Sequence, residues 1–385
     1  MSNLFPSFKT EPGKAYAASA VIAIVLLILP VVIGQFAGNF WVRTLDMALL
    51  YVMLALGLNI VVGYAGLLDL GYVAFYAVGA YMYALLASPH LMENFELIAA
   101  TFPGGLHSSI WLVVPLAAFL AAAFGAALGA PTLRLRGDYL AIVTLGFGEI
   151  IRIFMNNLNA PINITNGPQG ITKIDSVKIF GRDLGKSEMI AGLQIDTTQF
   201  YYYLFLALVI LTIIVSIRLQ NSRLGRAWMA IREDEIAAKA MGINTRNTKL
   251  AAFAIGASFG GVSGAMFSAF QGFIAPESFV LNESIVIVAM VVLGGMGHIP
   301  GVILGALLLY AIPEALRYGA KPVQDMIFGH EIITPEALRM LFFGLSMVGI
   351  MLYRPSGLWP APKHGDTMGK PEATETTATI AKAGA

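Results

Sequence analysis

Residues 42–63 read VRTLDMALLYVMLALGLNIVVG, a run long and apolar enough to cross the hydrocarbon core of a membrane. A spanning helix needs about 20 predominantly apolar residues, and only a helix hydrogen-bonds every backbone group of such a segment without water. Comparable runs recur along the chain. The sequence therefore predicts an all-α fold, a polytopic integral membrane helix bundle with about nine or ten transmembrane helices and glycine-rich broken segments. The expected spans are residues 15–35, 42–63, 67–87, 110–130, 139–155, 200–217, 250–272, 280–295, 300–317 and 337–353.

Two of the expected spans have an unusual feature. The eighth carries Asn282 and Glu283 at its start and runs into GGMG at 294–297, so it is either a full span or a half-helix. The first follows Lys9 and Lys14, as the apolar core of a signal peptide does. Its apolar run is long, however, and no convincing small-x-small cleavage site follows it. We interpret the first span as a retained helix.

The composition supports membrane insertion and excludes several classes of function. Hydrophobic residues make up 57% of the chain, charged residues 12%, and the mean hydropathy is +0.74, which is outside the usual range of water-soluble proteins. The net charge of +1 gives no support to nucleic-acid binding. The absence of cysteine excludes disulfides and thiolate chemistry, and the five histidines are too far apart to share a helix face. We therefore expect no metal site and no cofactor.

The distribution of basic residues predicts which loops face the cytoplasm. Arginine and lysine concentrate in cytoplasmic loops, so alternation from a cytoplasmic N-terminus at 1–14 places Arg134, Arg136 and the loop at 218–249 inside. The transmembrane domain is expected at 15–355, and its loop at 156–199 is expected outside, where basic and acidic residues balance. The tail at 356–385 has little to bury, which predicts a disordered cytoplasmic segment. The basic residues of the cytoplasmic loop are Arg218, Arg223, Arg226, Arg232, Lys239, Arg246 and Lys249.

The most informative part of the cytoplasmic loop is residues 225–242, GRAWMAIREDEIAAKAMG. It is too polar to span a membrane, Glu235 and Lys239 are spaced for an ion pair, and Gly242 suits a left-handed C-cap. We expect a short amphipathic surface helix that presents Ala237, Ala238 and Met241 to a groove on a soluble partner. A connector resting on lipid headgroups is the alternative. The candidate docking residues are Arg232, Glu233, Asp234, Glu235, Ala237, Ala238, Met241 and Gly242.

Several motifs occur in an order that is typical of one family. The sequence has a glycine-rich stretch at 57–81, LRGDYLAIVTLG at 135–146, TNGPQGI at 165–171, the loop at 225–242, and a second glycine-rich stretch at 294–306. Together they resemble the LivM-type permeases of high-affinity branched-chain amino acid ABC importers over residues 40–355. Residues 235–242 also resemble the EAA loop of ABC importer permeases, with one extra residue between the glutamate and the alanine pair.

The resemblance implies a function and a set of partners. Residues 15–355 would be a permease domain that pairs with a second, homologous permease subunit. Two cytoplasmic ATP-binding subunits would dock on the coupling loop at 218–249, and a periplasmic binding protein would deliver leucine, isoleucine or valine. The chain would be a multi-pass protein of the bacterial inner membrane with no catalytic residue of its own, because its partners hydrolyse ATP. Relatives that carry amides or urea look similar, so these substrates stay an alternative.

Four polar residues within the expected spans are candidates for the translocation path. A polar group in hydrocarbon costs a few kcal/mol unless it is paired or faces water, so Asn59 and Asp69 are functional-site hypotheses. Asp69 could instead cap the third span near the inner surface. Glu149 and Arg152 are three residues apart and can pair on one helix face. A structural ion pair is the first interpretation of these two residues, and lining of the path is the second.

The motif at 165–171 lies in the loop that is expected to be periplasmic. Following the resemblance, Asn166, Gly167, Pro168 and Gly170 are the external residues best placed to contact a binding protein. The alternative interpretation is a simple Pro-Gly turn.

Three other functions find less support in the residues. GRDLGKS at 181–187 resembles a P-loop but is one residue short between its glycines and lies in the expected periplasmic loop, so we reject nucleotide binding there. An ion-coupled secondary transporter needs paired intramembrane acids near the midplane, whereas the acids here are few and mostly near span ends. An intramembrane enzyme would need a cysteine nucleophile, a clustered set of histidines and acids, or a metal motif, and the sequence has none.

Overall fold

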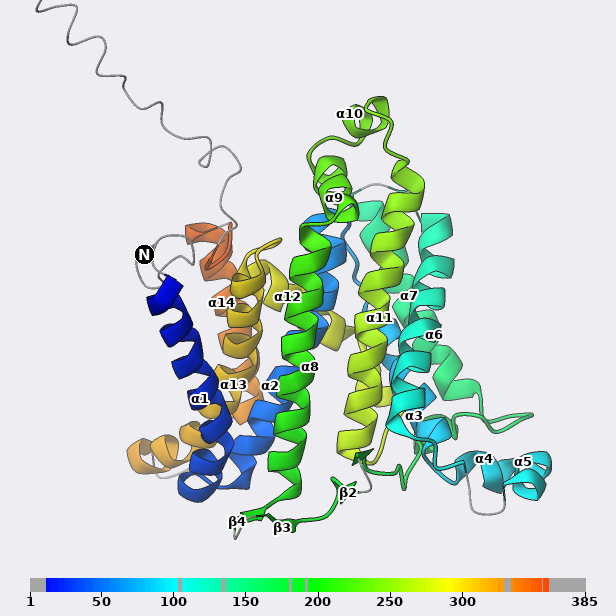
Figure 1. The fold of residues 1–385 in the computed structure, drawn as a ribbon, viewed down its shortest axis with the longest axis vertical. Helices are drawn as coiled ribbons and strands as arrows, with labels where there is room; N and C mark the ends of the chain where they lie inside the picture. Colours follow the sequence, from blue (N-terminus) through cyan, green and yellow to red (C-terminus); the bar gives the residue numbers. More distant parts are fainter. Residues whose placement is uncertain are drawn as a thin grey trace, which may run out of the picture.

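The computed structural model describes residues 12–102, 106–132, 135, 137–179, 182–190, 193–328, 334–354 and 356–359. Long helices run up and down between two ends of a bundle (Figure 1). These long helices are α1 (Pro12–Phe36), α2 (Asn39–Asn59), α3 (Val73–Leu86), α6 (Ile110–Thr132), α7 (Asp138–Asn157), α8 (Thr197–Gln220), α11 (Thr245–Gln271), α12 (Leu281–Gly294), α13 (Ile299–Phe328) and α14 (Pro335–Tyr353).

The helices lie where the apolar runs predict them, which confirms the all-α class. Six helical stretches of the described residues are long and apolar enough to cross a membrane: 39–64, 110–132, 197–220, 245–271, 276–294 and 299–319. Shorter apolar helical stretches occupy 20–36, 73–86 and 340–350. The chain is therefore a multi-pass membrane protein, while the exact number of spans stays a prediction.

The third helix begins later than the sequence predicts. A π-helical turn, η1 (Ile60–Tyr64), ends the helix that α2 begins, and α3 starts only at Val73. Gly66 has a φ of +68°, a left-handed conformation that glycine adopts without strain and that stops a right-handed helix. The expected span at 67–87 is therefore wrong at its start. We refer to residues 60–72 as the break segment.

The core of the bundle is built around α11, which packs against α6, α3 and α2. Small residues permit this packing: a Cβ atom added to Gly79 of α3 would lie 2.5 Å from the Cα atom of Gly261 of α11. Gly125 of α6 similarly faces Ala257 of α11, where an added Cβ would meet the alanine methyl at 2.6 Å. Small residues at these positions thus allow the helix backbones to approach each other closely.

The two ends of the bundle differ in structure (Figure 1). At the α10 end, the short helices α9 (Arg223–Glu233) and α10 (Glu235–Ala240) extend beyond the long helices. The hairpin end carries β1 (Lys178–Ile179) paired antiparallel with β2 (Arg182–Asp183), and β3 (Glu188–Ile190) paired with β4 (Leu193–Ile195). The same end holds α4 (His90–Asn94) and α5 (Glu96–Thr101).

The loops predicted for opposite sides of the membrane thus lie at opposite ends of the bundle. Which end faces the cytoplasm stays a prediction. Arg134, Arg136, the first eleven residues and the tail from residue 360 lie outside the described residues.

Candidate functional site

The loop at 218–249 forms two short helices rather than the single helix predicted for 225–242. Ser222 caps α9, because its hydroxyl accepts a hydrogen bond from the backbone N–H of Gly225 at 3.1 Å. At Asp234 the backbone is extended and the chain turns. The Asp234 carboxylate then accepts hydrogen bonds from the backbone N–H groups of Ile236 at 2.7 Å and Ala237 at 3.0 Å. Asp234 is therefore the N-cap of α10, which divides the predicted helix.

The predicted end of this segment is confirmed. Gly242 has a φ of +85°, and its N–H bonds to the carbonyl of Lys239 at 3.1 Å. The N–H of Ile243 bonds to the carbonyl of Ala238 at 3.1 Å. This pair of bonds is a Schellman motif, which requires the left-handed residue that glycine supplies.

The exposed side of α10 differs from the predicted docking surface. Ile236 and Met241 are 71% and 83% exposed, and Ala237 is exposed beside them. Ala238 is buried, so its predicted presentation to a partner is wrong. It follows Glu235 by three residues and shares the helix face that Glu235 turns toward α11. We call Ile236, Ala237 and Met241 the α10 surface, and Ile236 is a member that the sequence argument missed.

The opposite sides of α9 and α10 are fixed to the bundle. The Trp228 side chain is fully buried, and its indole N–H donates to the carbonyl of Thr248 at 2.7 Å. The ammonium of Lys249, at the start of α11, bonds to the Glu235 carboxylate at 2.6 Å. The sequence argument considered only Lys239 as a partner of Glu235. These two attachments hold the α10 surface in one orientation beyond the end of the long helices.

Arg232 makes a contact with the bundle that the sequence did not indicate. Although the residue is exposed at the surface, its guanidinium donates a hydrogen bond to the carbonyl of Gly63 in η1. Glu233, the next residue, is exposed and lies at the end of α9. Of the predicted docking residues, Ala237 and Met241 are thus exposed at α10, whereas Ala238 is buried and Arg232 faces the break segment.

Asn59 joins two interrupted helices. The residue is buried at the end of α2, and its side-chain oxygen accepts a hydrogen bond from the backbone N–H of Gly297 at 2.8 Å. Gly297 lies in the turn between α12 and α13, with a φ of +84°. In the same turn the Nδ1 atom of His298 lies 2.9 Å from the carbonyl of Trp359, and burial lowers the pKa of His298. Asn59 therefore holds the break segment against the α12–α13 turn.

Asp69 shapes the break segment and contacts its neighbour α7. Its carboxylate accepts a hydrogen bond from the N–H of Gly71 at 2.9 Å, just before α3 begins. The hydroxyl of Thr144, in α7, accepts from the N–H of Leu70 at 3.0 Å. Within the described residues no hydrogen-bond partner reaches Asp69 Oδ2, and the residue borders a cavity of about 10 Å³ that Thr144 also lines. That volume is close to the space one water molecule needs.

Glu149 and Arg152 form the predicted ion pair on α7. The Arg152 Nε atom donates to both Glu149 oxygens, at 3.0 and 3.1 Å. A third charge joins them: Glu277, in η3 (Pro276–Phe279), lies 3.9 Å from the Arg152 guanidinium and is 66% exposed. The Glu149 side chain is 40% exposed. We call these three residues the polar cluster, of which Glu277 had no sequence signal.

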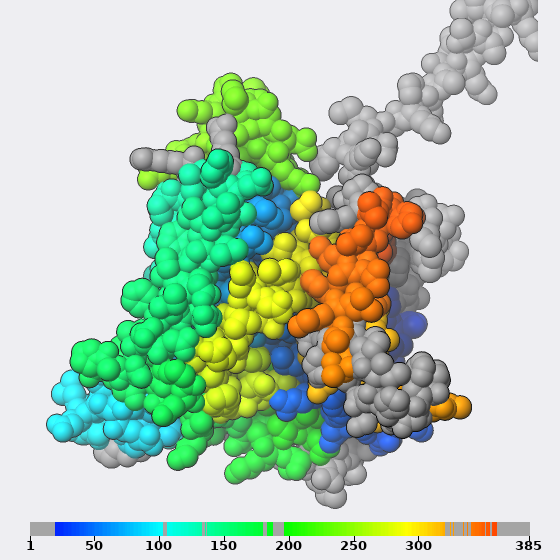
Figure 2. Space-filling view, turned by 180° about the vertical axis from the view of Figure 1, so that it is seen from behind, coloured from blue at the N-terminus to red at the C-terminus, as the bar shows by residue number. Residues whose placement is uncertain are grey.

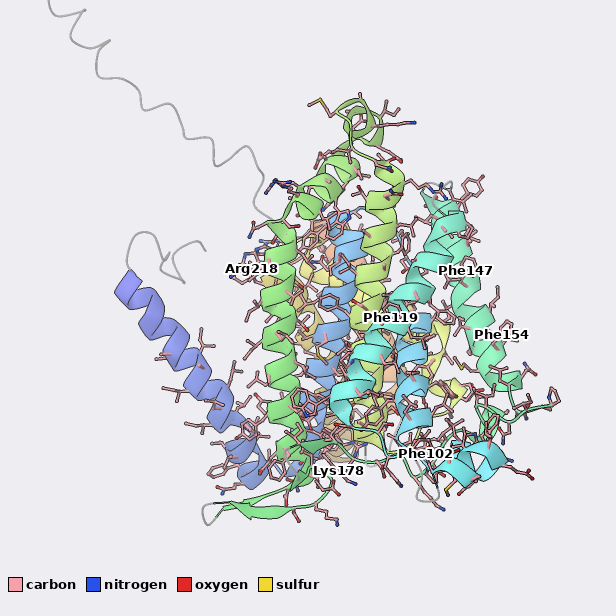
Figure 3. The ribbon with its side chains drawn as sticks, turned by 45° about the vertical axis from the view of Figure 1, so that its right-hand side comes forward. Phe102, Phe119, Phe147, Phe154, Lys178 and Arg218 are labelled. Atoms are coloured by element: carbon pink, nitrogen blue, oxygen red, sulfur yellow. The ribbon has the colours of Figure 1, made fainter. Side chains whose placement is uncertain are left out.

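The polar cluster lies on the outside of this chain. Figure 3 shows α7 at the edge of the bundle, with Phe154 projecting away from it. From behind, α7 (green), α12 (yellow) and α14 (orange) occupy one face, with blue atoms of the α2–α3 region visible between α7 and α12 (Figure 2). The structure does not bring the four predicted path residues together. Asn59 is buried at the end of α2 and Asp69 is buried in the break segment, whereas Glu149 and Arg152 are partly exposed on α7.

The TNGPQGI motif forms a tight loop near the hairpin end. Asn166, Gly167 and Gly170 all have positive φ, and the Asn166 amide donates to the Gly170 carbonyl at 2.8 Å. Gly167 and Gly170 are buried, so they shape the loop, while Pro168 and Gln169, in η2 (Gly167–Gln169), are exposed. An isolated bridge between Ile171 and Ile274 ties the loop to the segment before η3. Contact with a binding protein stays a prediction, and its candidates are the two exposed residues.

No group of histidine, aspartate and glutamate that could hold a metal ion occurs among the residues that the structure describes.

The stretch at 181–187 that resembles a P-loop is partly described. Asp183 and Gly185 form a turn in which the Asp183 carboxylate accepts a hydrogen bond from the Gly185 N–H at 2.9 Å. Its bond from the Ser176 hydroxyl lowers the pKa of Asp183.

These features define a multi-pass α-helical membrane protein with a rigidly attached pair of surface helices outside its bundle. The chain belongs to the family described as branched-chain amino acid transport system / permease component, whose sequence profile matches residues 40–351. It is 42% identical to the high-affinity branched-chain amino acid transport system permease protein LivM of Escherichia coli (strain K12), over 88% of this chain and 74% of that protein.

Other relatives extend the comparison to a second kind of permease. LivM of Salmonella typhimurium is 43% identical over 82% of this chain and 68% of its own length. The permease protein LivH of the same organism is 30% identical over 72% of this chain and 85% of its own length. This chain is thus similar to two kinds of permease that are named as parts of a high-affinity branched-chain amino acid transport system. No solved structure matches the chain.

Proposed function

We propose that this chain is one permease subunit of an ATP-driven importer that moves leucine, isoleucine and valine across the bacterial inner membrane. Its family and the names of its relatives support the substrate class. The single observation that supports coupling to a soluble partner is the α10 surface: Ile236 and Met241 are exposed on a helix whose other side is fixed to the bundle.

The α10 surface is proposed to dock in a groove of an ATP-binding subunit on the cytoplasmic side. Apolar side chains presented by a short helix are suited to insertion into a groove, and burying a Met or Ile side chain stabilises a complex by about 1.5–3 kcal/mol. The capping bonds of Asp234 and the Gly242 turn fix both ends of α10, so little conformational freedom is lost on docking. ATP hydrolysis belongs to the partner subunits in this proposal.

The side of α7 that carries the polar cluster is proposed to contact the second permease subunit and to line the translocation path. Glu149 lies near the middle of the 20-residue α7 and is partly exposed on this chain. A charged side chain in the middle of a bilayer costs at least about 2.5–3.5 kcal/mol, so lipid is an unfavourable neighbour for the polar cluster. A water-filled path between two permease subunits would solvate the three charges.

The exposed part of the TNGPQGI loop is proposed to receive the binding protein on the periplasmic side. The loop between α7 and β1, which contains Pro168 and Gln169, lies at the end of the bundle opposite α10, and this placement suits a partner on the other side of the membrane. The positive φ of Asn166, Gly167 and Gly170 gives the loop one defined shape, and a defined loop lowers the entropy cost of binding.

Purification and transport test the proposal together. The tagged chain, expressed with its genomic neighbours, is expected to copurify with ATP-binding subunits and a second permease. Reconstituted vesicles are expected to take up leucine only when ATP and leucine-loaded binding protein are both present. Uptake that requires an ion gradient and no ATP would instead favour a secondary transporter. A receptor that binds amides or urea but no leucine would change the substrate class and leave the ATP-driven mechanism in place.

A further inference from the structure

Arg232 connects the surface helices to the interrupted helices inside the bundle. Its guanidinium donates to the carbonyl of Gly63, in the last turn of η1. Its aliphatic stem packs against Gly66, where an added Cβ would lie 2.9 Å from the Arg232 Cγ atom. Both contacts are with the break segment, which is distant from Arg232 in sequence.

The Gly63 carbonyl is a favourable acceptor for a charged donor. After η1 the backbone N–H groups of Ala65 and Leu67 bond to Ile60 and Val61. Gly63 thus lies at a helix end, where carbonyl groups lack intrahelical partners. A hydrogen bond from a guanidinium is about twice as strong as one between neutral groups, so Arg232 is a strong ligand for this end.

The guanidinium also lies against the turn between α12 and α13. A Cβ added to Gly297 would lie 3.0 Å from the Arg232 Nη1 atom and 3.2 Å from the Gly63 carbonyl oxygen. A Cβ added to Gly63 would lie 2.6 Å from the Gly297 nitrogen. Asn59 accepts the Gly297 N–H in the same place. The break segment and the α12–α13 turn therefore lie against each other here, and Arg232 of α9 contacts both.

Arg232 joins α9 to this meeting point of the break segment and the α12–α13 turn. The break segment is in turn bonded to α7 through Thr144 and Leu70, and α7 carries the polar cluster. The described residues thus contain a continuous series of contacts from α10 through Arg232 and the break segment to α7.

We propose that Arg232 is a positioning residue that transmits displacement of α9 and α10 to the break segment and the α12–α13 turn, and that it is not a contact for the ATP-binding subunit. The inference rests on the proposed function. It differs from the sequence prediction, which placed Arg232 among the docking residues. According to this proposal, α10 binds the ATP-binding subunit. When that subunit moves α9 and α10, Arg232 displaces the break segment and the α12–α13 turn.

The test compares Arg232→Gln with Arg226→Gln in the complete complex in nanodiscs. Arg226 is an exposed arginine of the same helix that also donates to a backbone carbonyl, that of Asn221 at 2.8 Å. Among the described residues, no hydrogen bond or ion pair joins Arg226 to the break segment. We expect Arg232→Gln to keep the wild-type affinity for the ATP-binding subunits and to lose on the order of tenfold in leucine uptake and in ATP hydrolysis stimulated by leucine-loaded binding protein. Arg226→Gln is expected to match the wild type in all three measurements.

Hydrogen exchange separates transmission from a loss of folding. In the wild-type complex, ATP binding is expected to change the exchange rates of residues 60–72 and 295–298, and in Arg232→Gln that change is expected to disappear while α10 stays protected. Arg232→Lys, which keeps the positive charge and N–H donors but lacks the planar guanidinium, should recover part of the stimulated hydrolysis.

Two results would overturn the inference. One is loss of subunit affinity in Arg232→Gln comparable to that in Met241→Lys, which would make Arg232 a docking contact. The other is wild-type uptake and wild-type exchange changes in Arg232→Gln. Failure of the proposed function would look different, because the wild-type chain itself would then show no bound ATP-binding subunits and no ATP-dependent uptake.

Discussion

The α10 surface and the polar cluster of α7 differ in kind: the first exposes apolar side chains, and the second places charges on a helix of the bundle. On α10, Ile236 and Met241 expose apolar side chains beyond the end of the long helices. On α7, Glu149 and Arg152 place charge near the middle of a helix at the edge of the bundle, beside the apolar helices α3 and α6. Both arrangements are unfavourable in the isolated chain. The α10 surface leaves apolar area exposed, and the α7 charges are costly if lipid surrounds them.

The difference indicates two kinds of partner. An apolar surface in water is covered by an apolar groove, whereas charges within a membrane are best accommodated by water or by opposite charges of another membrane chain. The break segment lies between the two surfaces, since it contacts α9 through Gly63 and α7 through Leu70. A subunit with this arrangement has the parts needed to connect a soluble partner to events inside the membrane.

Removal of the cation from the polar cluster should have the largest effect. Arg152→Gln leaves Glu149 and Glu277 without their positive partner, at a cost of about 2.5–3.5 kcal/mol if the charge has no water to face. We expect the amount of assembled complex or its leucine uptake to fall on the order of 100-fold, measured by size-exclusion chromatography and vesicle transport. The double variant Glu149→Arg/Arg152→Glu is the matched control. Restored assembly without restored uptake would support a path-lining role, and restoration of both would indicate a structural ion pair.

A charge on the α10 surface should weaken docking strongly without changing insertion. Met241→Lys is expected to reduce affinity for the ATP-binding subunits by about 10- to 100-fold, because it removes 1.5–3 kcal/mol of apolar burial. Met241→Leu keeps the volume and apolarity of the side chain and should bind like the wild type. Binding can be titrated with the chain held in nanodiscs. Equal affinity of the lysine and leucine variants would remove Met241 from the docking surface.

Loss of the α10 cap should have a smaller effect. Asp234→Ala removes the acceptor of two backbone N–H groups, and an N-cap of this kind contributes about 1 kcal/mol to its helix. Amides of residues 236–241 should exchange roughly fivefold faster, with a similar decrease in docking affinity. Asp234→Asn keeps an acceptor oxygen and should exchange at nearly the wild-type rate. An unchanged rate in Asp234→Ala would show that tertiary contacts alone hold α10.

The smallest expected effect is a pH dependence of stability at the α12–α13 turn. Burial lowers the pKa of His298 from its ordinary 6.5 in the folded chain, so as the pH falls the unfolded chain takes up the proton first. This contribution to stability is complete above about pH 6.5 and is lost as the pH falls through the folded pKa. Between pH 7.5 and 5 the melting temperature of His298→Gln should therefore fall less than that of the wild type. Identical slopes would assign the acid sensitivity to other groups.

The arrangement of long helices could be predicted because the membrane imposes a single solution on apolar runs. A run such as 42–63 must be helical in hydrocarbon, and α2 with η1 covers it. The Gly242 cap was also predictable, since the left-handed conformation favours one residue type. The interruption of the helices at residues 65–72 was harder to predict, because most of these residues are apolar and compatible with a membrane helix. The left-handed conformation of Gly66 and the turn at Asp69 interrupt the helix there.

The parts that could not be predicted depend on contacts between distant residues. Asp234 lies among Glu233 and Glu235, all polar and compatible with a helix, so its role as a cap was not distinguishable. Arg232 bonds to Gly63, which is 169 residues away in the chain, and a charged residue in a polar loop gives no indication of such a partner. Glu277 similarly joins Arg152 only because η3 packs beside α7.

The decisive measurement is the side of the membrane on which α10 lies. The chain has no cysteine, so Met241→Cys and Lys178→Cys each create one labelling site, at the α10 end and at the hairpin end respectively. In intact spheroplasts, a membrane-impermeant maleimide is expected to label the Lys178→Cys variant and to reach the Met241→Cys variant only after the membrane is permeabilised. Labelling of Met241→Cys in intact spheroplasts would place α10 in the periplasm and contradict docking to cytoplasmic ATP-binding subunits.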